Sequence, residues 1–327
     1  MNGRIQAGVG ARRETADAAP RVAILLSTCE AYRAFAELTR SWLGRHWPGH
    51  PPVFSCGLER PGAPQDLPFA GDPRDWIGIV RQAAEELTAR GAEWLYLVLD
   101  DHPPVGPCHA RYLNEDLPAT ARRLGAIQVN LMGWDQFQPR DGETLGADAL
   151  HWQRNAPGFR WKFSLHPGGW HAPTLARMLR QLRERRPDAR SARAFEGELD
   201  AAVADAEPEL RARTYRVRGD GYAAGGRWFE RRAPRAAARR AIDVARLAAR
   251  AGGRGALGRL DGRLMPHLRY LNGPYPMVWS GLVRGGRVNP DALRFLDGIG
   301  RGDLAREVRA LPPPGGARAR DREGAAS

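Results

Sequence analysis

The strongest strand signal in the chain is WLYLVLDDHPP, residues 94–104. Its first six residues are all apolar, which is typical of a strand that is covered on both faces. The strand ends abruptly in two carboxylates and an imidazole, and Pro103 and Pro104 stiffen the exit from it. In open α/β sheets, ligands gather outside the carboxyl ends of the strands. The stretch therefore predicts a buried strand that ends in a ligand-binding turn.

Strand and helix signals alternate around this segment. Short apolar runs predict strands, and apolar residues at helical spacing predict helices. The strands are expected at 22–26, 52–56 and 126–131, and the helices at 31–47, 76–90 and 108–124. Asp75 is placed to cap the second helix. Repeated strand–helix–strand units imply a mostly parallel sheet flanked by helices, so we expect an α/β fold of Rossmann type.

The pattern loosens after residue 150. An alternating run at 159–165 suggests a strand near a surface, and HPGGW at 166–170 is typical of a turn. Ser191 is placed to cap one of the later helices. The remaining helices are expected at 172–186, 192–206, 235–250, 290–296 and 303–309, and the remaining strands at 214–218 and 276–280.

The positive charge is concentrated in one part of the chain. The net charge of +13 arises almost wholly within residues 211–269, where 16 arginines accompany 4 acidic residues. Arginines at helical spacing around 235–250 fit an amphipathic element beside anionic lipid or an anionic glycan. The alternative is an Arg-rich solvated helix from a GC-rich genome. Aromatic residues are sparse there and no nucleic-acid-binding module is recognisable, so nucleic acid is not expected as a partner.

Hydropathy and cysteine content limit the class of protein. No apolar run reaches the roughly 18 residues that a membrane-spanning helix needs. Cys29, Cys56 and Cys108 lack metal-binding spacing and are odd in number, so a disulfide scaffold is not expected. We therefore expect a cytoplasmic protein, which lies at the inner membrane if its basic segment binds anionic lipid.

The adjacent carboxylates of Asp100 and Asp101 create an electrostatic problem. They repel each other unless one is protonated or a cation lies between them. Mn²⁺ or Mg²⁺ prefers oxygen ligands, relieves the repulsion directly and often takes substrate phosphates into its coordination shell. We therefore predict a site for one of these ions at Asp100, Asp101 and His102. The alternative is that the two aspartates only cap a turn after the strand.

The ends of the predicted strands resemble those of a known family. The first three strands end in STC at 27–29, SCG at 55–57 and LDDH at 99–102. This succession resembles a GT-A-type glycosyltransferase, in which an Asp-rich motif at a strand end holds a divalent metal and a sugar nucleotide. The segments SLHPGGW at 164–170 and AFEGE at 194–198 are similar to a bacterial group linked to surface polysaccharide. The family pattern is usually Asp-X-Asp or Glu-Asp-Asp, from which Leu-Asp-Asp-His departs.

The resemblance implies an activity and a donor site. It implies metal-assisted, inverting transfer of a sugar from a nucleotide-sugar donor to a bacterial surface-glycan or lipid-linked acceptor. Asp100 would bind the donor together with Ser27, Thr28 and Cys29. Asp101 would act in catalysis at the metal and the donor diphosphate.

Two later motifs would serve the acceptor. Glu196 would be the general base that deprotonates its hydroxyl group, and the alternative is a solvated carboxylate on a helix face. Gly168 and Gly169 would let the acceptor approach the backbone, Trp170 would offer a flat face for a sugar, and His166 would flank them. The alternative for Trp170 is a place in the core.

The resemblance also divides the chain by function. Residues 1–20 and 312–327 are expected to form a disordered arm and tail. Residues 21–150 would be the nucleotide-sugar-binding half and residues 151–311 the acceptor-binding half, which includes the helical, Arg-rich part at 211–269. Two other functions remain open: a non-catalytic glycan- or membrane-associated assembly protein with a degenerate GT-A fold, and a sugar-phosphate nucleotidyltransferase. The latter usually has a Gly-rich basic loop after its first strand, where this chain has STCE.

Overall fold

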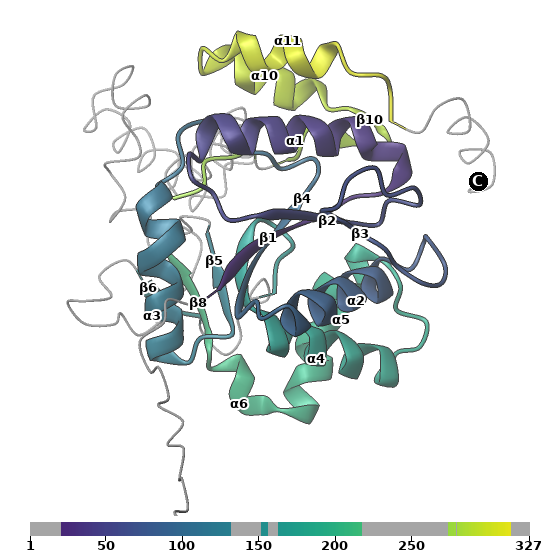
Figure 1. Cartoon of the computed structure of the whole chain (residues 1–327), viewed down its shortest axis with the longest axis vertical. Coiled ribbons are helices and arrows are strands. Elements are labelled where there is room, and N and C mark those ends of the chain that lie inside the picture. Colours follow the sequence, from purple (N-terminus) through teal and green to yellow (C-terminus); the bar gives the residue numbers. More distant parts are fainter. Residues whose placement is uncertain (1–20, 132–151, 156–162, 218–273, 279, 315–327) are drawn as a thin grey trace, which may run out of the picture.

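An eight-stranded sheet forms the centre of the computed structural model, which describes residues 21–131, 152–155, 163–217, 274–278 and 280–314 (Figure 1). Its strands are β1 (Val22–Ser27), β2 (Val53–Cys56), β3 (Asp66–Leu67), β4 (Trp94–Leu99), β5 (Gln128–Asn130), β6 (Trp152–Arg154), β7 (Gly168–His171) and β8 (Thr214–Val217). Their order in the sheet is β3-β2-β1-β4-β7-β5-β8-β6. β4 therefore lies in the interior of the sheet, as its apolar sequence requires.

The sheet is mostly parallel. β1 pairs in parallel with both β2 and β4, and β5 pairs in parallel with β8. β7 is antiparallel to both of its neighbours, β4 and β5, and β6 is antiparallel to β8. This arrangement confirms the predicted α/β fold class and is consistent with the GT-A-like architecture that the resemblance implies. The carboxyl ends of β1, β2 and β4 meet at one edge.

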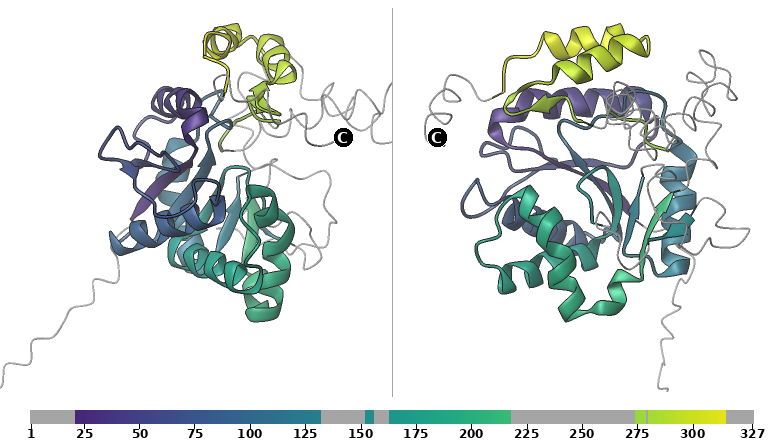
Figure 2. Two further views of the ribbon diagram at one scale, coloured as in Figure 1. Left: turned by 90° about the vertical axis from the view of Figure 1, so that its right-hand side faces the viewer. Right: turned by 180° about the vertical axis from the view of Figure 1, so that it is seen from behind.

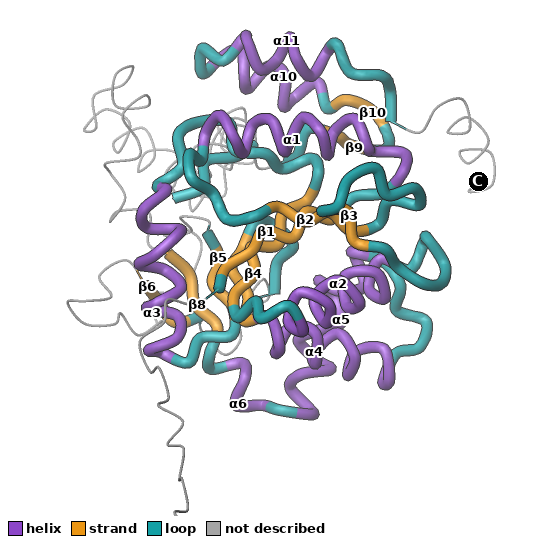
Figure 3. Tube along the Cα trace, viewed as in Figure 1, coloured by secondary structure: helices purple, strands orange, loops and turns teal. Residues whose placement is uncertain are grey.

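Helices cover both faces of the sheet (Figures 1 and 3). One face packs against α1 (Arg33–His46) and α3 (Leu117–Leu124), and the other packs against α2 (Trp76–Ala89), α4 (Ala172–Arg185) and α5 (Ala192–Ala206). Short helices η1 (Glu30–Tyr32), η2 (Tyr112–Asp116) and α6 (Pro208–Arg211) complete this part. Leu95 and Leu97 face the second group of helices, whereas Tyr96 and Val98 face the first. A strand buried on both sides needs apolar residues at every position, which explains the unbroken run.

Two C-terminal helices, α10 (Pro290–Gly298) and α11 (Gly302–Arg309), pack on the outer side of α1 (Figure 2). A small hairpin, β9 (Val283–Arg284) and β10 (Arg287–Val288), precedes them. Trp42 on α1 donates its indole N–H to Glu307 at 2.8 Å, and Arg45 contacts the same carboxylate at 2.6 Å. These two contacts join α11 to α1.

Several sequence predictions are confirmed. The helix predicted at 76–90 is α2, and the Asp75 side chain caps it by accepting from the Gly78 amide. The helix predicted at 192–206 is α5, and Ser191 caps it by accepting from the Ala194 amide. In both cases a short polar side chain satisfies an amide that has no partner within the helix.

The turn predicted at 166–170 is wrong in its second half. Residues 168–171 form β7 in the interior of the sheet, between β4 and β5. The reason is packing: a Cβ on Gly169 would lie 2.6 Å from the Trp94 indole, so only glycine fits there. A Gly-Gly pair in a sequence is typical of a turn. Here the two glycines lie in a strand, where they let neighbouring groups pack closely against the backbone.

Two further strand predictions are not confirmed. The strand predicted at 276–280 contributes only an isolated bridge between Met277 and Pro104. Of the run at 159–165, the described residues 163–165 form no strand, and the rest lies outside the described residues. The predicted helix at 235–250, the disordered arm at 1–20 and most of the tail at 312–327 also lie outside them.

The two predicted halves of the chain share one sheet. β7, β8 and β6 come from beyond residue 150 and pair with β4 and β5, or with each other. Of the basic segment at 211–269, residues 211–217 are described, and they end α6 and form β8. In the described part of the chain, no helix has the length and apolar character needed to cross a membrane.

We expect Gly169→Ala to lower the free energy of unfolding by about 1–3 kcal/mol, because its Cβ overlaps the Trp94 indole in a packed layer. Gly197→Ala is the matched control. Gly197 is exposed on α5, a Cβ there would have no atom within 4 Å, and alanine favours the helix by up to about 1 kcal/mol. Urea denaturation of both variants measures the difference, and equal stabilities would contradict the proposed packing role.

Candidate functional site at the carboxyl end of β4

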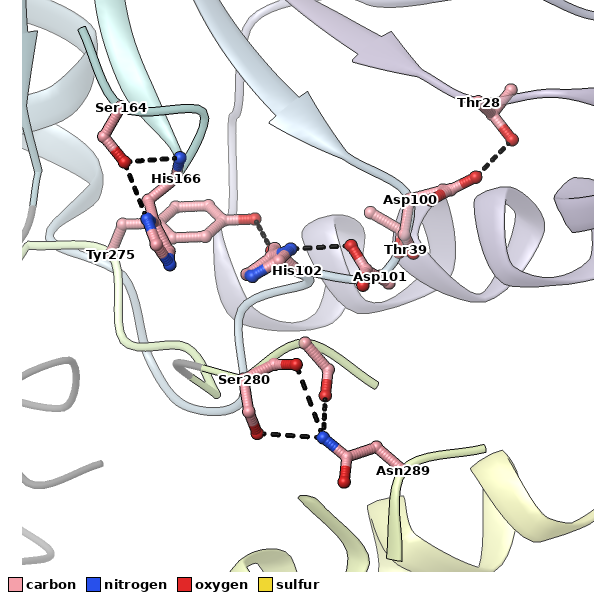
Figure 4. Close-up of polar contacts among 11 residues, drawn as sticks. Thr28, Thr39, Asp100, Asp101, His102, Ser164, His166, Tyr275, Ser280 and Asn289 are labelled. Carbon is pink, nitrogen blue, oxygen red and sulfur yellow. Dashed lines mark hydrogen bonds and ion pairs between the residues drawn. The ribbon is translucent and has the colours of Figure 1, made fainter. Parts of the chain in front are cut away.

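Asp100 is fixed by the first strand and the first helix (Figure 4). Its Oδ2 accepts a hydrogen bond of 2.6 Å from the Thr28 hydroxyl, at the end of β1. Its main-chain amide donates to the Ser27 carbonyl at 3.1 Å, and its carbonyl accepts from the Thr39 hydroxyl at 2.7 Å. Thr39 is fully buried on α1. The carboxylate is therefore held by the Thr28 hydroxyl, and the main chain of Asp100 is held by Ser27 and by Thr39 of α1.

Asp101 and His102 follow in the same turn, and their side chains contact each other. Asp101 Oδ1 lies 2.6 Å from His102 Nδ1, and the two side chains are 19% and 10% exposed. The main chain of this pair is bound by a distant segment: the Leu282 amide donates to the Asp101 carbonyl at 2.7 Å, and the Tyr275 hydroxyl donates to the His102 carbonyl at 3.1 Å. A segment more than 170 positions later thus closes the site.

The electrostatics of the turn are dominated by the two carboxylates. Burial, and then the charge of Asp101, raise the pKa of Asp100 from 3.8 to about 7, against the Thr28 hydrogen bond and the His102 charge. Burial and then the Asp100 charge also raise the pKa of both Cys29 and Tyr32. Within the described residues, no Arg or Lys forms an ion pair with Asp100 or Asp101. The site is therefore a partly buried concentration of negative charge.

A second loop approaches His102 from the other half of the chain. The rings of His102 and His166 are perpendicular at 86°, with centroids 5.3 Å apart. His166 Nδ1 lies 2.7 Å from the Ser164 hydroxyl oxygen. Glu196 on α5 holds this loop, because its Oε1 accepts from the Leu165 amide at 2.8 Å and from the Ser164 hydroxyl at 3.4 Å. The structure thus links Glu196 to the aspartate turn through the loop.

The residues predicted to bind the donor lie together. Ser27 ends β1, and Thr28 and Cys29 follow it beside Asp100. The Ser27 hydroxyl accepts from the Trp76 indole at 2.7 Å and is buried, whereas Cys29 is partly exposed. Beyond β2 lies a shallow pocket of about 290 Å³, lined by Leu58, Glu59, Pro61, Pro68, Phe69, Gly71 and Pro73.

The prediction for the acceptor residues needs a correction. Trp170 is completely buried between Phe163 and Phe195, with ring centroids 5.9 and 5.8 Å away, so its face is not available to a sugar. Gly168 and Gly169 are buried in β7, where they allow close packing and not ligand approach. Of the four predicted residues, His166 alone is partly exposed and next to the aspartate turn.

The predicted metal site stays a prediction. The described residues contain no group of three or more His, Cys, Asp or Glu side chains arranged to hold a metal ion. His102 is engaged through Nδ1 with Asp101, so the three-ligand arrangement with His102 is not assembled. The two carboxylates still fit a hard divalent cation, because such an ion is commonly bound by one or two carboxylates with water and phosphate oxygens. It would also relieve the repulsion that raises the pKa of Asp100.

Sequence reasoning missed the parts of the site that come from elsewhere in the chain. Thr39 is one helix position among many, and Tyr275 and Leu282 follow a long basic segment. Leu282 acts through its main-chain amide, which nearly every residue type has, so its role cannot be predicted from the sequence. Gly281, next to Leu282, is the residue whose type could have indicated a contact with the site, since glycine often marks a place where the backbone approaches another group closely.

A comparison with solved structures found a distant similarity. The chain is similar to a glycosyltransferase involved in the glycosylation of the major capsid of PBCV-1, with a TM-score of 0.28 and 13% identity, covering 61% of this chain and 94% of that chain. No protein-family model matches the chain, and no curated protein is significantly similar to it. A similarity this low carries no argument about activity, which is therefore argued from the site.

We expect the titration of Asp100 to destabilise the protein, relative to Asp100→Asn, by an increasing amount as pH rises from about 4 to about 7. Its pKa is raised from 3.8 to about 7, so the folded protein binds more protons than the unfolded chain in this interval. Asp100→Asn should remove this loss, which is on the order of 3 kcal/mol. Urea denaturation between pH 4 and pH 8 measures it.

The comparison between wild type and Asp100→Asn also separates the contribution of Asp100 to the pH dependence of stability from the contribution of the histidines. Burial and then Arg301 lower the pKa of His46 from 6.5 to about 4, which makes stability rise with pH in the same range. That contribution is common to both proteins and cancels in their difference. Identical pH profiles for the two proteins would show that Asp100 does not titrate as described.

Proposed function

We propose that this chain is a glycosyltransferase that transfers a sugar from a nucleotide-sugar donor to a bacterial surface-glycan or lipid-linked acceptor. The observation that carries the proposal is the pair of partly buried carboxylates at the end of β4, without an Arg or Lys ion pair among the described residues, beside the polar end of β1. This edge of a mostly parallel sheet is where ligands bind in such folds.

Asp100 and Asp101 would bind the donor through a divalent cation. The residues that would hold Mn²⁺ or Mg²⁺ are these two aspartates, and the bound ion would neutralise the diphosphate leaving group. Thr28 orients Asp100 through its 2.6 Å hydrogen bond, and His102 orients Asp101 through its 2.6 Å contact. Both carboxylates are thereby presented from a rigid turn.

The nucleoside would lie beside the ends of β1 and β2. Thr28 and Cys29 follow β1 next to Asp100, and Ser27 supports them from a buried position. The pocket beyond β2 offers an apolar wall around Phe69 and a carboxylate at Glu59. A flat base against apolar side chains and a ribose hydroxyl on a carboxylate are the contacts that this lining favours.

Glu196 would be the general base. Both hydrogen bonds that it accepts from the loop fall on Oε1, which leaves Oε2 to take the proton of the acceptor hydroxyl. His166 in the same loop would contact the acceptor, because it is partly exposed and packs against His102. Inversion of the anomeric centre is what a single base of this kind supports.

A non-catalytic assembly protein is the second candidate. The observation in its favour is that Glu196 holds the main chain of the loop, which is a structural task, and that no three-ligand metal cluster is present among the described residues. A sugar-phosphate nucleotidyltransferase has less support, because STCE stands at the end of β1 in place of a Gly-rich basic loop. Contact between residues 211–269 and an anionic inner-membrane surface stays a prediction.

We expect Mn²⁺-dependent binding of one of UDP, GDP, CDP or TDP in isothermal titration. Asp101→Asn should weaken this binding at least about tenfold, because it removes a charge from the cation site. Asp188→Asn is the control, since Asp188 is exposed and its carboxylate accepts hydrogen bonds from Arg186. If the wild-type protein binds none of the four nucleotides in a metal-dependent way, the proposed activity is wrong.

We expect Glu196→Gln to reduce the rate of sugar transfer by about 100-fold or more while donor binding is unchanged. Glutamine keeps a carbonyl oxygen for the Leu165 amide, so the loop stays in place. Glu198→Gln is the matched control on the same helix, where the carboxylate contacts Arg186. The readout is release of nucleoside diphosphate from the donor selected above, with a bacterial lipid-linked glycan fraction as acceptor. Equal rates for the two variants would favour the assembly-protein alternative.

A further inference from the structure

Gly281 lies directly against the aspartate turn. A Cβ at this position would overlap Asp101 Oδ2 and would lie 3.1 Å from His102 Cε1. The backbone of Gly281 has φ of 68°, in the left-handed region that favours glycine. Glycine is therefore required here for two independent reasons, and one of them is the space that Asp101 and His102 occupy.

The turn that carries Gly281 is bound to the aspartate turn through the main chain. The Leu282 amide donates to the Asp101 carbonyl at 2.7 Å, and the Gly281 amide donates to the Val278 carbonyl at 3.2 Å. Contact on the side chain and a hydrogen bond on the main chain thus fix the same residue, Asp101.

A buried asparagine holds the turn in place. Asn289 is 1% exposed, and its Nδ2 donates to the Ser280 carbonyl at 3.3 Å, the Ser280 hydroxyl at 3.0 Å and the Gly281 carbonyl at 3.1 Å. Its Oδ1 accepts from the Asp291 amide at 3.0 Å and so caps α10. The position of Gly281 is therefore tied to the first turn of a helix.

The same segment is anchored in the C-terminal core. Val278 and Leu282, on either side of Gly281, are 1% and 0% exposed, and they pack in one cluster with Phe35 and Trp42 of α1. The turn is consequently packed against α1. The same helix holds Asp100 through Thr39.

We propose that Gly281 is a positioning residue: the turn at 280–282 holds Asp101 and His102 in the one orientation in which the Asp101 carboxylate can receive a ligand. The proposal rests on the proposed function for the nature of that ligand, a divalent cation with a nucleoside diphosphate. The contacts that orient Asp101 belong to the protein alone, so they can be tested without the ligand.

Gly281→Ala tests the proposal, with Gly285→Ala as the matched control. Gly285 also has a positive φ, 57°, but a Cβ there meets no atom within 4 Å. Both variants therefore carry the backbone strain of a left-handed alanine, and only Gly281→Ala also displaces Asp101. The first readout is the Cε1–H NMR signal of His102 at fixed pH, assigned with His102→Gln. The second is Mn²⁺ binding measured by electron paramagnetic resonance, alone and with UDP, GDP, CDP or TDP.

We expect the His102 signal to move in Gly281→Ala and to stay in place in Gly285→Ala, and Mn²⁺ binding to weaken at least about tenfold in the first variant only. Equal His102 signals in the two variants would overturn the proposal. If the wild-type protein binds neither Mn²⁺ nor a nucleotide while the His102 signal moves selectively, the positioning role stands and the proposed function fails.

A second pair of variants decides the question if Gly281→Ala does not fold. Asn289→Asp keeps the acceptor that caps α10 but loses the Nδ2 group, which donates to three acceptors on Ser280 and Gly281. Asn114→Asp is its control, because Asn114 likewise accepts from the Trp47 indole through Oδ1 and donates to the Gly49 carbonyl through Nδ2, away from the site. The His102 signal should move in Asn289→Asp alone, and no movement there would overturn the proposal.

Discussion

The repulsion between two neighbouring carboxylates at the end of a covered strand is the constraint on which the site depends. Burial and the charge of Asp101 together raise the pKa of Asp100 to about 7, so the folded protein holds this pair at the expense of stability. Proteins accept such local conflicts mainly at functional sites, where the surroundings determine the geometry. Here the surroundings are the ends of β1 and β4, the buried side of α1 and the C-terminal turn.

Apart from His102, which contacts Asp101, the groups that hold the two residues are neutral donors. Thr28 and Thr39 contribute hydroxyl groups and Leu282 contributes an amide, while no Arg or Lys among the described residues pairs with either aspartate. The chain as a whole has 50 basic residues and a net charge of +13, so cations for such a pair are plentiful in the sequence. The negative charge of the turn is thus not neutralised by an Arg or Lys of the described residues, as the proposed cation site would require.

The site joins three segments that are far apart in the sequence. The aspartate turn comes from β4, the His166 loop is held by Glu196 of α5, and the turn around Gly281 is held by Asn289 at the start of α10. Each support is a hydrogen bond to the main chain or to a side chain that itself has a fixed partner. Donor and acceptor functions, as proposed, would therefore be positioned by one continuous scaffold and not by two separate domains.

The sequence by itself determined the α/β class, the buried strand at 94–99, the caps at Asp75 and Ser191 and the polar turn at Asp100 and Asp101, because periodicity, capping and strand ends are local properties. Only the tertiary structure decided that Gly168–His171 is a strand, that Trp170 is core and that Gly281 closes on Asp101. These depend on which side chain fills the space next to a glycine, and that neighbour comes from a distant part of the chain. Trp94 in one case and Asp101 in the other occupy the volume that a Cβ would need, and no local pattern reveals it.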